Sequence, residues 1–108
     1  MVTQTNPPQN VIDCLQIILD AIATGNYELF LRVGNADYKA GITKEMFDSV
    51  SSQLSPRMSE GYTITYFGQL KQREYQTYLW KLSFADAGDE FVIRMAVNED
   101  KVAGISIT

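Results

Sequence analysis

The acid–base and nucleophilic chemistry open to this 108-residue chain is narrow, because it contains no histidine and a single cysteine. Without histidine, neither a Ser–His nor a Cys–His nucleophile pair can form, and zinc sites with histidine ligands are excluded. Carboxylate, tyrosine or lysine chemistry remains, together with sites for hard cations. No EF-hand loop and no glycine-rich phosphate loop is present, so we expect neither a metal nor a cofactor.

Cys14 is the one candidate nucleophile, and it lies in an apolar stretch of helical spacing. A reactive thiol needs a cationic neighbour that stabilises the thiolate. The nearest polar residues in the sequence are Asp13 and Gln16, and neither is a cation. We therefore interpret Cys14 as a buried structural thiol.

The overall charge of −4 and the scattered arrangement of nine basic residues argue against a nucleic-acid partner. The apolar run at residues 11–23 contains Asp13 and Asp20, and it is too short and too charged for a membrane span. No secretion signal is recognisable at the start of the sequence. These features predict a cytoplasmic protein with no membrane partner.

Helical spacing dominates the first half of the chain, after a tail at residues 1–6 that we expect to be flexible. A first helix should start at Asn6 and Pro7, which suit a cap and a first turn. Gly25 should end it.

A second helix is expected at residues 26–34 with Asn26 as its cap, and a third begins at Thr43. The Ser55-Pro56 pair should end that third helix, because the residue before a proline disfavours helical backbone. Residues 36–41 are either irregular or a short strand.

The apolar period then changes to two, which predicts strands at residues 62–70, 75–84, 90–97 and 102–107. The loops between them are short, so successive strands should form hairpins and an antiparallel meander. The sequence thus predicts one α+β domain over residues 1–108, with three N-terminal helices packed on a four-stranded sheet.

The apolar pattern also predicts the register, because a slip of one residue would turn every side chain to the other face. We expect Ile64 opposite Trp80, Leu82 opposite Ile93 and Met95 opposite Ile105. This register collects large apolar side chains on one face, which the helices should cover, with Trp80 near its middle. The members of this inner face are Tyr62, Ile64, Tyr66, Tyr78, Trp80, Leu82, Phe84, Phe91, Ile93, Met95, Val97, Ala103, Ile105 and Ile107.

The opposite, outer face is mixed, and its centre is small or apolar. Its members are Thr63, Thr65, Phe67, Gln69, Thr77, Leu79, Lys81, Ser83, Glu90, Val92, Arg94, Ala96, Val102, Gly104 and Ser106. The expected register sets Lys81 directly opposite Arg94, which is unfavourable unless a partner's carboxylate or a bound anion neutralises the pair. The alternative is that both side chains extend into water.

Two short segments resemble sequences of a known superfamily. Residues 25–30, Gly-Asn-Tyr-Glu-Leu-Phe, are similar to a frequent Gly-Asp-Tyr-x-x-Phe segment, with Asn26 in place of aspartate. Residues 80–84, Trp-Lys-Leu-x-Phe, are similar to second-strand segments of uncharacterised bacterial members. The chain thus resembles the cystatin-like, nuclear-transport-factor-like superfamily, which includes ketosteroid isomerase, scytalone dehydratase and polyketide-cyclase-like domains.

This resemblance implies helices packed on a strongly curved sheet, a conical pocket between the two layers, and dimerisation through the outer sheet face. Enzymatic members place an Asp/His or an Asp/Tyr set in that pocket, and the first is impossible here. By type, the base would be Asp13 or Asp37, and the donors Tyr38, Tyr62, Tyr66 or Tyr78. The inner face holds tyrosines without a carboxylate, which favours a non-enzymatic role.

Three hypotheses follow. The first is a non-enzymatic homodimer, with Leu79, Lys81, Val92, Arg94 and Ala96 at the interface and a small apolar ligand against Tyr62, Tyr66, Tyr78 and Trp80. The alternative for those rings is that they simply fill the core. The second is a carboxylate/tyrosine lyase or isomerase, which needs a desolvated carboxylate. The third is a protein-interaction or assembly module anchored by Lys81 and Arg94.

Overall fold

A computed structural model describes residues 6–108, so residues 1–5 of the predicted tail lie outside the described part of the chain. Four helices precede the strands: α1 (Gln9–Thr24), α2 (Tyr27–Arg32), α3 (Ala36–Gly41) and α4 (Lys44–Met58). Four strands follow: β1 (Tyr62–Gln72), β2 (Tyr75–Phe84), β3 (Phe91–Asn98) and β4 (Lys101–Ile107). The α+β class with helices first and sheet second is confirmed.

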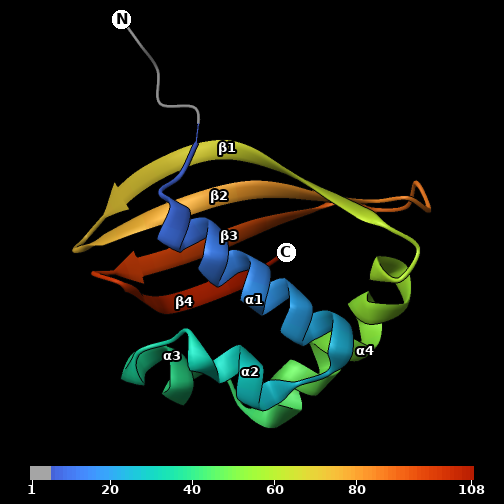
Figure 1. The fold of residues 1–108 in the computed structure, drawn as a ribbon, viewed down its shortest axis with the longest axis horizontal. Coiled ribbons are helices and arrows are strands. Elements are labelled where there is room, and N and C mark those ends of the chain that lie inside the picture. Colours follow the sequence, from blue (N-terminus) through green and yellow to red (C-terminus); the bar gives the residue numbers. More distant parts are fainter. Residues whose placement is uncertain (1–5) are drawn as a thin grey trace, which may run out of the picture.

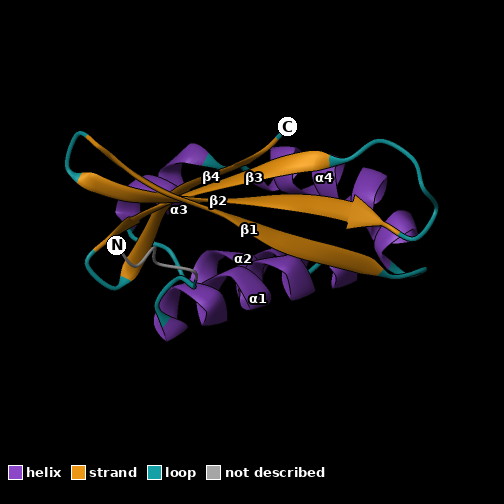
Figure 2. Ribbon diagram, turned by 90° about the horizontal axis from the view of Figure 1, so that it is seen from above, coloured by secondary structure: helices purple, strands orange, loops and turns teal. Residues whose placement is uncertain are grey.

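The sheet is an antiparallel meander with strand order β1-β2-β3-β4, as predicted. Figure 1 shows the helices gathered below the sheet, with α1 running along its lower face. Seen from above, the strands cross over one another because the sheet is strongly twisted (Figure 2). The core therefore lies between the inner sheet face and one layer of helices.

The first helix starts later than the sequence suggested. Pro8 precedes α1 without a side-chain capping bond, so the predicted start at Asn6 and Pro7 is wrong. Gly25 ends the helix with a left-handed φ of 68°, as expected of a residue without a Cβ. Its buried stripe consists of Val11, Leu15, Ile18, Leu19, Ala21 and Ile22.

Side-chain caps start the other helices. The Asn26 side chain accepts the Leu29 N–H at 3.0 Å, and the Thr43 hydroxyl accepts the Met46 N–H at 3.1 Å. Both predicted caps are confirmed. Residues 36–41, expected to be irregular or a short strand, form the short helix α3, so that expectation was wrong and the helix layer contains four helices rather than three.

Helix α4 continues through Pro56 to Met58, so the predicted stop at Ser55-Pro56 is wrong. A proline in the last turn removes one intrahelical hydrogen bond, a cost that tertiary contacts of the same turn can offset. Arg57, the next residue, provides such contacts.

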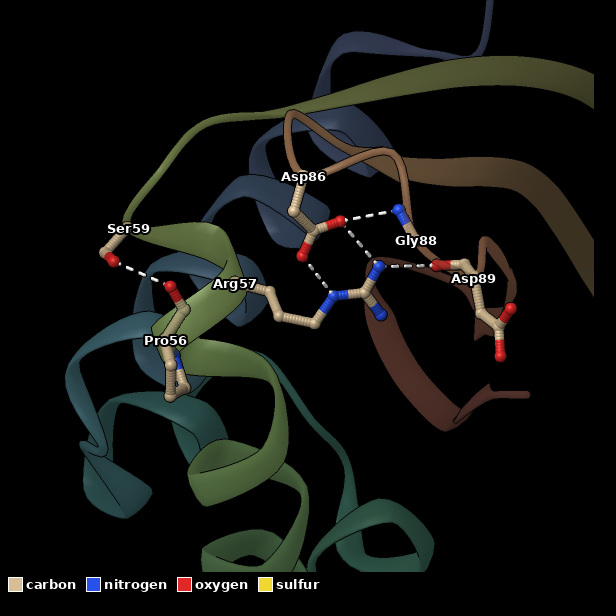
Figure 3. A network of polar contacts seen from close by, with 6 residues as sticks. All are labelled: Pro56, Arg57, Ser59, Asp86, Gly88 and Asp89. Atoms are coloured by element: carbon tan, nitrogen blue, oxygen red, sulfur yellow. Dashed lines mark hydrogen bonds and ion pairs between the residues drawn. The ribbon is translucent and has the colours of Figure 1, made fainter.

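Arg57 fastens the end of α4 to the loop between β2 and β3 (Figure 3). Its Nε and Nη2 atoms lie 2.7 and 3.0 Å from the two carboxylate oxygens of Asp86, and Nη2 also donates to the Asp89 carbonyl at 2.8 Å. The guanidinium carbon lies 4.0 Å from the centre of the Phe84 ring. Within the loop between β2 and β3, the Gly88 N–H donates a further hydrogen bond to the Asp86 carboxylate at 2.8 Å.

The register differs from the predicted one by two residues in the middle of the sheet. Trp80 stands opposite Tyr66 and Ile93, whereas Ile64 pairs with Leu82. The Met95–Ile105 pair is as predicted. A shift of two residues preserves side-chain alternation, so Trp80 still lies on the inner face, where 3% of it is exposed.

Two bulges, at Phe67 and at Ala103, alter the faces of β1 and β4. Each adds one residue to its strand and so reverses the alternation beyond it. Val102 was expected on the outer face, but it pairs with Val97 and is fully buried. That assignment was wrong because periodicity alone does not reveal an inserted residue.

Strand β4 connects the sheet to the helices at its beginning. The Val102 N–H donates to the Val33 carbonyl at 3.0 Å, and the Asn35 N–H donates to the Val102 carbonyl at 2.9 Å. These bonds occupy the outer edge of β4 near its start and hold the junction of α2 and α3 against it.

Candidate functional site

The rings proposed as ligand contacts pack against one another on the inner face. Tyr66 and Tyr78 lie 5.7 and 6.2 Å from Trp80, measured between ring centres. Tyr78 and Trp80 are buried, whereas Tyr62 and Tyr66 are half-buried. Neither of the two hollows described below is lined by any of the four.

The Tyr66 hydroxyl is the unusual atom of this cluster. It is buried and has no hydrogen-bond partner among residues 6–108. Desolvation by burial raises its pKa above the ordinary value, and the nearby Tyr78 adds to that effect. The phenol of Tyr66 therefore stays protonated at neutral pH.

The carboxylates needed for an isomerase-like site are in solvent. Asp13, Asp20 and Asp37 are all exposed, and the first two accept hydrogen bonds from Gln9 and Gln16 on the surface of α1. A desolvated base is therefore missing from this set, and the lyase or isomerase hypothesis loses its base.

The surroundings of Tyr38 and Cys14 indicate structural roles for both side chains. The Tyr38 hydroxyl donates to the Phe30 carbonyl at 2.9 Å inside the core, and burial raises the pKa of that phenol strongly. Cys14 is half-buried, and burial together with Asp13 raises the pKa of its thiol, the direction opposite to activation. Among the described residues, no group of three metal-ligating side chains occurs.

An apolar groove of about 260 Å³ lies between the helices and the end of β4. Ile22, Phe30 and Phe47 form its buried floor. On the rim, 53% of Met46 and 37% of Val50 are exposed. The remaining lining residues are Ile42, Ile105, Ser106, Ile107 and Thr108.

The walls of this groove are held in place by contacts between helices. The Ser51 hydroxyl, buried in α4, donates to the Ile22 carbonyl near the end of α1 at 2.6 Å. The rings of Phe30 and Phe47 pack with their centres 4.9 Å apart. The Tyr27 hydroxyl donates to the Ile42 carbonyl across the helix layer. The groove is therefore preformed, as small-molecule sites usually are.

The chemistry of the groove is that of binding. Its lining contains no charged side chain, and the hydroxyls of Ser106 and Thr108 are its polar side-chain groups. It offers neither a general base nor an activated nucleophile. A neutral, mostly apolar molecule with one hydrogen-bonding group matches this lining.

Met46, Phe47, Val50 and Leu54 recur at helical spacing in α4, but nothing in the sequence alone indicated a site there. Phe47 and Leu54 are buried, whereas Met46 and Val50 remain uncovered. The available signal was an apolar stripe on α4 that is wider than the surface its neighbours cover. The position of β4 was needed to recognise the uncovered part as the rim of a groove.

The five residues proposed as a dimer interface belong to β2 and β3 on the outer face of the sheet. Arg94 is exposed, and Leu79, Lys81, Val92 and Ala96 are half-buried. The predicted Lys81–Arg94 opposition is wrong, because Lys81 pairs with Val92 and Arg94 pairs with Leu79. The two-residue register shift separates the like charges, so no neutralising partner is required for that reason.

Two large apolar residues of β1 are exposed beside this region. Phe67 is 59% exposed at the bulge, and Leu70 is 42% exposed opposite Thr77. We call Phe67, Leu70, Leu79 and Val92 the outer patch.

No known protein-family model matches this chain, and no curated protein matches it either. Among the described residues, no helix is both long and apolar enough to cross a bilayer. The function must therefore be argued from the sites themselves.

Proposed function

We propose that this protein is a non-catalytic binding domain that holds a small apolar ligand in the groove between α4 and β4. The observation that carries the proposal is a preformed, uncharged groove whose rim residues Met46 and Val50 are exposed hydrophobics. Its volume is close to the lower end of ligand sites, which begin at about 300 Å³. The ligand class is a neutral molecule with a compact hydrocarbon body.

This site replaces the cluster around Trp80 as the preferred ligand position. The groove still lies between helices and sheet, which agrees with the proposed cystatin-like, nuclear-transport-factor-like relationship and its pocket. The test is equilibrium binding of a neutral apolar probe, compared between the wild-type chain and Val50→Trp.

A second proposal is that two copies associate through the outer sheet face. The exposed Phe67 and Leu70 beside the half-buried Leu79 and Val92 favour it, because contiguous exposed apolar side chains mark interaction surfaces more often than free surface. Such a dimer would be isologous, with the same patch on both copies. Its test is the mass of the protein in solution.

Both proposals describe binding rather than turnover. They are independent, since the groove and the outer patch lie on opposite sides of the sheet, and either can fail without the other.

A further inference from the structure

The outer sheet face contains an open hollow of about 680 Å³, which shares the lining residues Ile105 and Ser106 with the apolar groove. Its floor is a row of small residues that crosses the sheet, in which Thr77 pairs with Ala96 and Ala96 pairs with Gly104. Arg94 rises from the neighbouring row, while Arg73 and Tyr75 approach from the hairpin between β1 and β2.

Gly104 is the residue that makes the hollow possible. A Cβ built at this position meets no atom within 4 Å, and Gly104 is not among the glycines with a positive φ. By contrast, a Cβ at Gly34 would overlap the Tyr38 ring. Glycine inside a strand normally weakens it, and it often marks a place where a ligand approaches closely. Neither the backbone conformation nor the packing requires glycine at position 104. The effect of the missing side chain is therefore to leave open space above the sheet.

The charged groups around the hollow are of one sign. Its lining contains two arginines and no carboxylate, although the chain as a whole carries a charge of −4. Neither Arg73 nor Arg94 has a salt bridge or side-chain hydrogen bond to another residue within 6–108. Such a concave, positive site in an acidic protein attracts anions.

Arg73 lies in the hairpin turn that borders the hollow. It occupies the two-residue turn between β1 and β2 with a φ of 57°. Asparagine or glycine adopts this left-handed conformation at lower cost. Glu99 has almost the same φ, 58°, in the turn between β3 and β4, so Arg73 is relevant because it lines the hollow and not because of its backbone.

We propose that this hollow binds a small organic acid, whose carboxylate pairs with Arg94 and Arg73 and whose flat apolar body lies over Ala96 and Gly104. Arginine binds carboxylates through two parallel hydrogen bonds, which fixes the orientation of the acid. Thr77 and Tyr75, whose side chains carry hydroxyl donors, also line this hollow. This inference does not rest on the apolar groove.

The test uses 2-naphthoate as the probe, with neutral 2-naphthamide and inorganic phosphate as comparisons, in calorimetric titrations of the full chain. We expect 2-naphthoate to bind at least about ten times more tightly than either. Arg94→Gln should weaken 2-naphthoate at least about tenfold. Arg73→Gln should weaken it several-fold. Lys81→Gln, which removes a cation from the same face but not from the lining, should leave it unchanged.

The variant Gly104→Val distinguishes binding in the hollow from a general attraction of anions to positive charge on the surface. It should place a branched side chain on the floor where the ring of the acid would lie and so abolish 2-naphthoate binding, while the melting temperature stays equal or rises because valine favours a strand. Val50→Trp, which closes the apolar groove, should have no effect on 2-naphthoate. Equal binding of the acid and the amide, equal losses in Lys81→Gln and Arg94→Gln, or a loss in Val50→Trp would each overturn the proposal. Phosphate binding as tight as that of 2-naphthoate would overturn the organic-acid assignment.

Discussion

The Arg57 guanidinium lies against the Asp86 carboxylate through two hydrogen bonds of 2.7 and 3.0 Å, joining the end of α4 to the loop between β2 and β3. Residues 29 positions apart in the chain are thereby connected. Since this loop joins two central strands, the contact fixes the helix layer relative to the sheet and indirectly positions α4 at the groove.

The first prediction concerns Asp86→Asn, which removes the charge with little change in size. We expect the melting temperature at pH 7 to fall by a few degrees, because the charge-assisted bonds from Arg57 weaken. Asp48→Asn is the matched control. It breaks the Lys44–Asp48 pair, whose side chains are both largely exposed, and should have almost no effect.

The same pair predicts a pH dependence. Hydrogen bonds from Arg57 and then from the Gly88 N–H lower the pKa of Asp86 from its ordinary 3.8 to about 2. Because the pKa is lower in the folded state, the stabilisation is complete above about pH 4 and is lost as the pH falls toward 2. The difference in melting temperature between wild type and Asp86→Asn should therefore shrink over that range. A constant difference would contradict this account.

The second prediction concerns the Tyr66 hydroxyl, which is buried and has no hydrogen-bond partner in the described part of the chain. An unsatisfied buried polar group costs about 1–3 kcal/mol. Tyr66→Phe should therefore raise the free energy of unfolding by about 1 kcal/mol in denaturant titrations. Tyr27→Phe provides the comparison, because it removes the bond from the Tyr27 hydroxyl to the Ile42 carbonyl and should lower the same quantity. A loss of stability in Tyr66→Phe would mean that this hydroxyl has a partner, either a water or a ligand.

The third prediction concerns self-association. Light scattering at concentrations of tens of micromolar should give a mass of two chains, and Phe67→Asp should give a mass of one, because a buried charge opposes the interface. Met46→Asp removes an equally exposed hydrophobic from the groove rim and should remain dimeric. A wild-type mass of one chain under these conditions rejects the outer-face dimer.

The sequence predicted the fold to the extent that its pattern is periodic. The caps at Asn26 and Thr43 were identified because their side chains bond within a few residues along the chain. The meander followed from short loops, and the inner face around Trp80 followed from alternation.

What the sequence did not reveal depends on contacts between distant segments. The position of Val102 depends on a bulge, and the continuation of α4 past Pro56 accompanies a contact made by Arg57 with a loop far along the chain. The expected opposition of Lys81 and Arg94 failed because an alternating pattern fits registers two residues apart equally well.

The candidate sites were harder to predict for the same reason. The groove is formed by residues of α1, α2, α4 and β4, and no local motif marks it. In the outer hollow, Arg94, Ala96 and Gly104 were all expected on the outer face, but the contribution of Arg73 became clear only from the structure.

The most direct test of the proposed function is a titration of the protein with N-phenyl-1-naphthylamine, a neutral apolar probe whose fluorescence rises in dry surroundings. We expect one saturable site with a Kd of about 10–100 μM. Val50→Trp should abolish the site by filling the groove, whereas Ser52→Trp, on an exposed position of the same helix outside the lining, should retain it. Absent binding to the wild type, or equal binding to the two tryptophan variants, would contradict the proposal that the groove between α4 and β4 is a ligand site.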